Sequence, residues 1–185
     1  MNESNNPSAV RSKKEITDAL LKLMKKYPYN EISVKQIVLE TDLVRKTFYR
    51  NFSSKDDVLE SYINMKTWEY VEALMDRTDP LTVIFEYCSR NRELLELLDR
   101  NGLMYMLLNR LNEILPEVSR TTDRERNPFS KLIGDLDPDY IIALNIGAIW
   151  NIMTLWVKRG MKDSPEKIRA AIEQYLKNLS LSSSH

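Results

Sequence analysis

The feature that most restricts the fold of this chain is a pair of short amphipathic segments on either side of Thr41-Asp42, within residues 32–52. Before this break, Ser33 and Gln36 have the spacing of a helix capping box, and an apolar face follows from Val34, Ile37 and Val38. After the break, Phe48 and Phe52 lie one helical turn apart, so both point to the same side of a helix. The pattern predicts two short helices, the second covering roughly residues 44–51, that pack across a tight turn.

With both phenylalanines inward, the second short helix turns a different set of side chains outward. This face combines cations, a hydroxyl and an aromatic ring: Arg45, Lys46, Thr47, Tyr49 and Arg50. Such a mixture is typical of a recognition helix in a DNA major groove. The alternative from spacing alone is an ordinary small helical bundle with a charged outer face.

The charge distribution points in the same direction. Although the whole chain has a formal net charge of zero, the segment from Arg11 to Lys55 holds 11 cations and 5 anions, about +6 by this count. The remainder is therefore acidic. A basic head on an acidic body is typical of a DNA-binding domain joined to a second unit. Chance clustering on solvated helix faces is the alternative.

The rest of the chain predicts helices only, because glycine is scarce and leucine, isoleucine, methionine and charged residues are frequent. An apolar stripe predicts a first helix over residues 10–26, and Ser54 with Asp57 opens another that runs to about Met75. Asp79, Asp137 and Ser164 each precede a proline, a pattern typical of helix starts. The later predicted helices are 81–99, 102–115 (ended by Pro116), 138–159 and 165–179. Residues 117–137 read as a loop with a short helix near 129–133, and residues 1–9 as a disordered leader.

One later segment, Ile141–Val157, is apolar enough to resemble a membrane span. It is slightly short, and it contains Asn145, Asn151 and Thr154. We therefore expect no membrane insertion. A helix buried all round, inside a bundle or a dimer interface, is the preferred interpretation.

The segment around the two short helices resembles the DNA-binding domain of the TetR family of regulators. The resemblance is carried by Ile32-Ser33-Val34-x-x-Ile37, by Thr47-Phe48-Tyr49-x-x-Phe52, and by Ser54-Lys55-Asp56-Asp57-x-Leu59. It implies phosphate contacts for Ser33, Tyr49 and Lys55. It also implies base contacts for Val44, Arg45, Lys46 and Thr47, with Arg45 as the candidate for a bidentate guanine contact. Arg50 is assigned to either backbone or base.

The sequence departs from the usual family pattern at the turn and the recognition helix. The family usually has Ala-Gly where this chain has Thr41-Asp42, and glycine suits the turn because it accepts positive φ. Aspartate tolerates that geometry better than most residues, at a higher cost. Val44, Lys46 and Asn51 replace a common Ser, Gly and His, which leaves the base specificity open.

The resemblance also implies an all-α fold in which the C-terminal half forms a helical bundle, dimerises and binds a small effector. We expect residues 10–55 to form the helix-turn-helix domain and residues 56–181 the ligand-binding and dimerisation domain. The last two predicted helices would build a four-helix dimer interface. The stretch from Gly147 to Glu166 is similar to the C-terminal domain of a TetR subgroup common in Firmicutes.

An effector pocket, if present, is expected between the fourth helix and the bundle. Its candidate lining residues are apolar, aromatic or amide side chains: Trp68, Tyr87, Met104, Tyr105, Leu108, Phe129, Asn145 and Trp150. We expect a small hydrophobic or amphipathic effector. The alternative is that these side chains are plain core.

Signatures of an enzyme or a metal site are missing from the sequence. The one histidine is His185 in a serine-rich tail, and no glycine-rich phosphate loop or cysteine cluster occurs. We expect no catalytic residues, no metal and no cofactor. The one cysteine, Cys88, and the polar start of the chain favour the cytoplasm.

The sequence therefore predicts a homodimeric repressor that binds a near-palindromic double-stranded DNA operator and is released by a small effector. A co-activator or adaptor with the same fold, acting through a protein partner, is the alternative.

Overall fold

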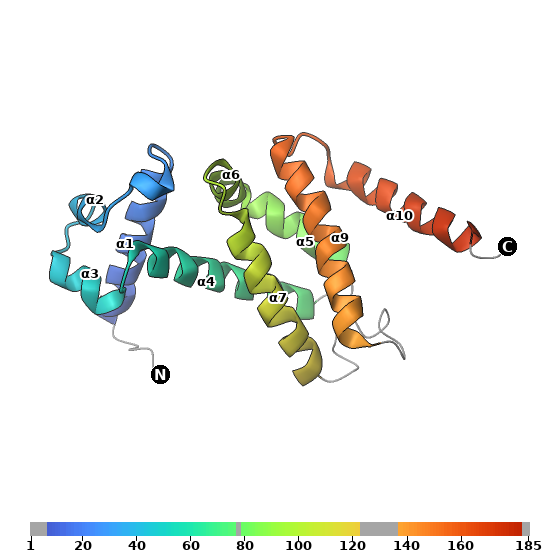
Figure 1. The fold of residues 1–185 in the computed structure, drawn as a ribbon, viewed down its shortest axis with the longest axis horizontal. Coiled ribbons are helices and arrows are strands. Elements are labelled where there is room, and N and C mark those ends of the chain that lie inside the picture. The colour runs from blue at the N-terminus through green and yellow to red at the C-terminus, as the bar shows by residue number, and fades with distance from the viewer. Residues whose placement is uncertain (1–6, 77–78, 123–136, 183–185) are drawn as a thin grey trace.

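A computed structural model describes residues 7–76, 79–122 and 137–182 of the chain. In these residues every regular element is a helix, as the sequence predicts. Figure 1 shows a head of α1, α2 and α3 at one end, a body of α5, α6, α7 and α9, and α4 running between them.

The head is built around one small core. It comprises α1 (Pro7–Met24), the 3-10 turn η1 (Tyr29–Glu31), α2 (Val34–Leu39) and α3 (Arg45–Asn51). The predicted stripe of α1 is buried, with Ile16 and Leu20 fully inaccessible. Ile37 from α2 and Phe48 from α3 are equally inaccessible, so α1, α2 and α3 share one apolar centre.

Helix α4 (Lys55–Met75) joins this head to the body. It starts where the sequence predicts, with the Ser54 side chain accepting a hydrogen bond from the Asp57 amide at 3.1 Å. It packs against α1 in the head and against α5 and α7 in the body (Figure 1). The predicted division between residues 55 and 56 stays a prediction, because α4 runs through both parts.

The body contains α5 (Pro80–Arg90), α6 (Arg92–Arg100), α7 (Met104–Thr121) and α9 (Pro138–Lys158), followed by α10 (Pro165–Ser182). The predicted caps are present: the side chains of Asp79 and Asp137 accept from backbone amides at the starts of α5 and α9. Ser164 accepts in the same way from the amide of Lys167 at 3.3 Å.

Two predicted helix boundaries are wrong. The single helix expected over residues 81–99 is divided at Asn91, whose backbone amide and side-chain amide both donate to the Tyr87 carbonyl. Asparagine side chains compete in this way with the helical backbone. The helix expected to end at Pro116 continues as α7 to Thr121, with Pro116 inside it and Ser119 buried beyond it.

The expected leader does not extend to residue 9. Pro7–Ala9 belong to α1, while residues 1–6 lie outside the described part of the chain. The short helix expected near residues 129–133 lies outside it too.

Helices α9 and α10 are poorly covered within one chain. By length and composition α9 could cross a membrane, but only 28% of its most apolar stretch is buried, and the buried side packs on α6 and α7. A single chain therefore does not bury this helix all round. On α10, residues 173–178 are all exposed, and Figure 1 shows this helix extending away from the body.

The corner between these two helices has unusual backbone geometry. Gly160 and Met161 have φ values of 68° and 49°, and Met161 is the one non-glycine residue with positive φ among the described residues. The corner is held by the Trp156 indole, which donates to the Asp163 carbonyl at 2.9 Å, and by the Arg92 guanidinium, which donates to the Gly160 carbonyl at 2.6 Å. The direction of α10 is therefore tied to α6.

Candidate nucleic-acid interface

The capping box that opens α2 is present as predicted. The Gln36 amide donates to the Ser33 hydroxyl oxygen at 3.3 Å, and the Ser33 amide donates to the Gln36 side-chain oxygen at 2.8 Å. Because both partners are fixed, the position of Ser33 at the exposed start of α2 is well defined.

The turn between α2 and α3 does not use positive φ at Asp42, which glycine at this place in related sequences would suggest. The turn is held by hydrogen bonds that involve side chains. The Thr41 hydroxyl donates to the Val38 carbonyl at 2.9 Å and accepts from the Leu43 amide at 3.2 Å. The Asp42 amide donates to the Glu15 carboxylate on α1 at 2.9 Å. The expected cost of a left-handed Asp42 therefore does not arise.

The inward side of α3 agrees with the prediction. Phe48 is fully buried and Phe52 is 5% exposed, with their ring centroids 6.3 Å apart. They belong to the same core as Ile37, and Leu43 packs against it from the turn. This packing fixes which face of α3 is left for solvent.

The outward side of α3 carries the predicted contact residues. Val44, which caps the helix, is 67% exposed and Tyr49 is 49% exposed. Arg45, Lys46 and Arg50 are exposed as well, and Thr47 is half-buried. The six recognition-helix candidates therefore lie together on α3 and its N-cap.

Lys55, the eighth predicted contact, is oriented differently. Its ammonium donates to the carbonyls of Tyr29, Asn30 and Ile32 at 2.6, 3.3 and 2.8 Å, and lies 4.6 Å from the Tyr29 ring centroid. It points into the turn that precedes α2.

The positive charge of the head is partly neutralised by ion pairs. Lys22 pairs with Glu40, whose pKa is lowered by this hydrogen bond, and Lys25 pairs with Glu93 of the body. In the described part of the chain, Lys35, Lys46 and Arg50 take part in no ion pair. Three of the cations without an ion pair therefore lie on α2 and α3, and Arg11 of α1 and Lys26 after α1 likewise form none among the described residues.

The side chains predicted to line an effector pocket differ in their exposure. Tyr87 and Met104 are buried, Leu108, Asn145 and Trp150 are half-buried, and Trp68 and Tyr105 are exposed. Asn145 donates to the Ile141 carbonyl within its own helix at 2.7 Å. Phe129 lies outside the described residues.

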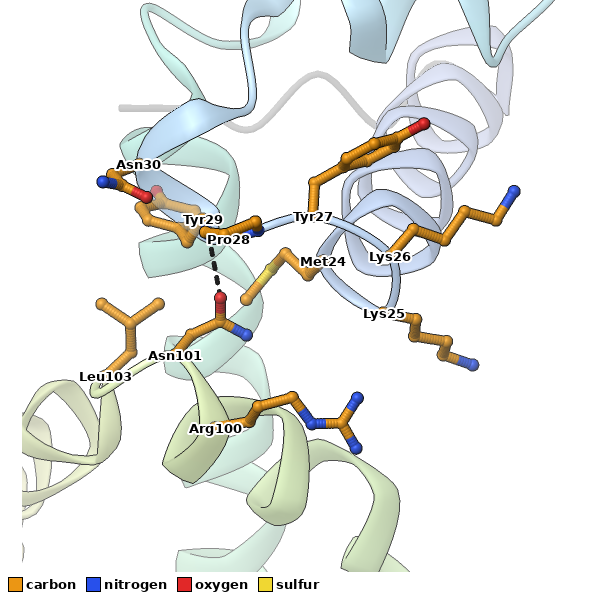
Figure 2. A pocket seen from close by; sticks show the side chains of 10 residues that line it. All are labelled: Met24, Lys25, Lys26, Tyr27, Pro28, Tyr29, Asn30, Arg100, Asn101 and Leu103. Carbon is orange, nitrogen blue, oxygen red and sulfur yellow. Dashed lines mark hydrogen bonds between the residues drawn. The ribbon is translucent and has the colours of Figure 1, made fainter.

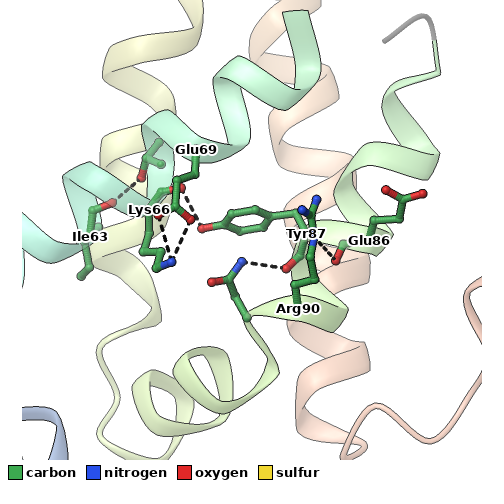
Figure 3. Close-up of polar contacts among 8 residues, drawn as sticks. Ile63, Lys66, Glu69, Glu86, Tyr87 and Arg90 are labelled. Atoms are coloured by element: carbon green, nitrogen blue, oxygen red, sulfur yellow. Dashed lines mark hydrogen bonds and ion pairs between the residues drawn. The ribbon is translucent and has the colours of Figure 1, made fainter. Parts of the chain in front are cut away.

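Tyr87 on α5 is hydrogen-bonded to α4 (Figure 3). Its hydroxyl donates to the Lys66 carbonyl on α4 at 2.9 Å, and its ring lies 5.3 Å from that of Tyr70. Burial raises the pKa of Tyr87 and of the neighbouring Cys88 thiol, the latter to about 12. These contacts join α4 to α5.

Two cavities stand out in the described residues, and neither includes a predicted effector residue. One, of about 540 Å³, lies between α5 and the start of α10. The other, of about 410 Å³, lies where the head meets the body and is shown in Figure 2. It is lined by the end of α1, the turn at Tyr29 and the turn after α6, where Asn101 accepts a hydrogen bond from the Tyr29 amide at 2.9 Å. No sequence pattern signals this contact, because the two residues are 72 positions apart.

Comparison with known proteins supports the assignment of the head. Residues 16–62, from α1 into α4, match the family model for bacterial regulatory proteins of the tetR family. No curated protein matches the sequence. The C-terminal resemblance to a Firmicutes subgroup stays a prediction.

Two solved structures are similar over nearly the full length. The fatty acid degradation regulator FadR from Bacillus halodurans is 20% identical, with a TM-score of 0.61, over 94% of this chain and 96% of that one. The dihydroxyacetone kinase operon activator DhaS is 22% identical, with a TM-score of 0.57, over 92% and 96%. At these identities the likeness shows a shared helical fold.

Proposed function

Starting from an N-terminal TetR-type helix-turn-helix domain, we propose that this chain is a homodimeric transcriptional repressor that binds a near-palindromic operator and is released by a small effector. The observation that carries the proposal is the outward face of α3. It presents cations, a hydroxyl and an aromatic ring above a core that fixes its orientation.

The contacts follow from the geometry of this face. Arg45 is proposed as the bidentate guanine contact, with Lys46, Thr47 and the Val44 side chain at neighbouring base edges. An exposed valine methyl group suits the 5-methyl group of thymine. Ser33, Tyr49 and Arg50 are proposed to contact the sugar-phosphate backbone.

A homodimer is supported by the apolar surface that one chain leaves open. On α9 the exposed large side chains include Leu144 and Leu155, and on α10 they include Tyr175 and Leu176. A soluble helix with so much uncovered apolar surface is typical of an interface. Two such helices from each of two subunits would form a four-helix bundle and present two recognition helices to the DNA.

Release by an effector is proposed to act through the separation of the two heads. An effector that binds one spacing of the heads more tightly shifts the population toward it, and DNA affinity changes accordingly. The eight side chains predicted for its site, from Trp68 to Trp150, remain a proposal, as does a small hydrophobic or amphipathic ligand.

The test is selection of fragments from a genomic library by the full-length protein. The expected result is enrichment of a palindrome whose half-site centres are about 34–36 Å apart, together with lower transcription of a reporter that carries it. Intact dimers that enrich no sequence would contradict the proposal and favour the adaptor. Raised transcription of the reporter would contradict the repressor role but not the proposed DNA binding.

A further inference from the structure

The ammonium group of Lys55 is fully engaged inside the head. A lysine has three N–H donors, and here three backbone carbonyls accept from them at 2.6, 2.8 and 3.3 Å. The same ammonium group also lies over the Tyr29 ring, in a cation–π contact. A phosphate contact would therefore require Lys55 to give up hydrogen bonds that it already makes.

The three carbonyls belong to the turn between α1 and α2. The last of them is on Ile32, next to Ser33, which caps α2 and is a proposed phosphate contact. A lysine at the start of α4 therefore fixes the backbone that leads directly into α2.

Tyr29 in this turn is also held by the body. Its amide donates to the Asn101 side chain at 2.9 Å, and Asn101 in turn donates to the Leu97 carbonyl at the end of α6. The Tyr29 hydroxyl donates to Asp56 on α4 at 2.5 Å. Burial and this hydrogen bond raise the pKa of Tyr29, so the phenol stays a donor at neutral pH.

We propose that Lys55 is a positioning residue of the DNA-binding head rather than a phosphate contact, and that it holds a turn which Asn101 fastens to the body. This inference rests on the proposed DNA binding. The family resemblance implies that Lys55 contacts DNA directly, whereas this proposal assigns it contacts within the protein.

Salt dependence separates the two functions. Each phosphate neutralised by a protein cation contributes about 0.9 to the slope of log affinity against log salt concentration. We propose to measure this slope for the full-length protein by fluorescence anisotropy, on a duplex recovered from a random-sequence library. Lys55→Met is compared with Arg50→Met, which removes one positive charge from the exposed face of α3, at a side chain proposed to contact the DNA backbone.

For Arg50→Met we expect a smaller slope, because a cation on the DNA backbone is lost. For Lys55→Met we expect weaker binding, by about tenfold, with the wild-type slope, because carbonyls rather than phosphates lose their partner. A slope reduced as much as in Arg50→Met would overturn the proposal.

Lys55→Arg provides a second test that keeps the charge. A planar guanidinium cannot direct its donors to three carbonyls converging on one point, although it binds phosphate well. We expect Lys55→Arg to bind DNA more weakly than wild type, with an unchanged salt slope. Wild-type affinity in this variant would contradict the positioning function.

Hydrogen exchange tests the positioning without DNA. Lys55→Met is expected to speed exchange at the amides of Glu31 and Ile32, which close the turn, while Arg50→Met leaves them unchanged. Unchanged exchange in Lys55→Met would refute the inference. If the wild-type protein bound no DNA, the proposed function would fail, and this measurement would still decide whether Lys55 orders the turn.

Discussion

The guanidinium carbon of Arg45 lies 5.5 Å from the ring centroid of Tyr49, and the same guanidinium donates to the Tyr49 hydroxyl at 3.3 Å. The two residues are one helical turn apart on the exposed face of α3. Tyr49 therefore has two functions in the proposed interface, because it lies where the DNA backbone would pass and it restrains the side chain proposed to read a base.

Arg45→Ala is expected to relax sequence preference, at a cost of about 1–3 kcal/mol for the cognate base and little for others. Tyr49→Ala is expected to weaken binding to all sequences. Competition binding with a set of base-substituted duplexes measures both effects. A uniform loss in Arg45→Ala, with preference intact, would contradict this division.

Tyr49→Phe serves as the matched control for this pair. It keeps the ring under the guanidinium and removes the hydroxyl acceptor. We expect it to lose less sequence preference than Arg45→Ala, since the cation–π contact remains.

The turn before α3 makes a prediction about stability. Thr41→Ala removes two hydrogen bonds and is expected to lower the free energy of unfolding by about 1 kcal/mol in urea titrations. Asp42→Gly is expected to destabilise by about 0.5–1 kcal/mol, because Asp42 does not use positive φ and glycine adds disorder to the unfolded chain. A stabilised Asp42→Gly variant would show that the turn is strained.

The uncovered face of α9 predicts the assembly state. Leu144, which is 67% exposed in one chain, is expected to be buried in a dimer, so Leu144→Glu should yield monomers by light scattering at micromolar concentration. Met65→Glu places the same charge at an exposed apolar position on α4 and should leave the dimer intact. A wild-type monomer would refute the proposed architecture.

Burial of Cys88 leads us to expect that the free energy of unfolding falls as the pH rises above about 8.5. Burial raises the pKa of its thiol to about 12, whereas an unfolded cysteine titrates near pH 8.5. The folded state therefore binds the proton more tightly. Its contribution is complete below about pH 8.5 and is lost as the pH rises toward 12, by up to about 1.4 kcal/mol per pH unit.

The measurement is urea unfolding between pH 8 and pH 10. Above this interval, titration of the buried Tyr70 and Tyr87 would also change the free energy of unfolding. Wild-type protein should lose stability through this interval, and Cys88→Ala should lose less, since it has no thiol to titrate. Parallel pH profiles would show that the thiol ionises freely in the folded protein.

Local patterns predicted the head well, because its features depend on residues a few positions apart. The capping box of Ser33 and Gln36 and the paired burial of Phe48 and Phe52 follow from spacing alone. The division at Asn91 and the continuation through Pro116 were missed, because each depends on competition between local preference and packing in the body. The contact of Tyr29 with Asn101 joins residues far apart in sequence, so no periodicity signals it.

Helix α6 is hydrogen-bonded to a different segment of the chain at each of its two ends. Arg92 at its start holds the Gly160 carbonyl, where α10 leaves the body, and Asn101 just after its end holds the turn in front of α2. Nine helical residues span about 13 Å, and an intact helix of this length behaves as a stiff rod. A tilt of α6 would displace both attachments together, so the direction of α10, which is proposed to form the dimer interface, and the position of the turn before α2 depend on the same helix.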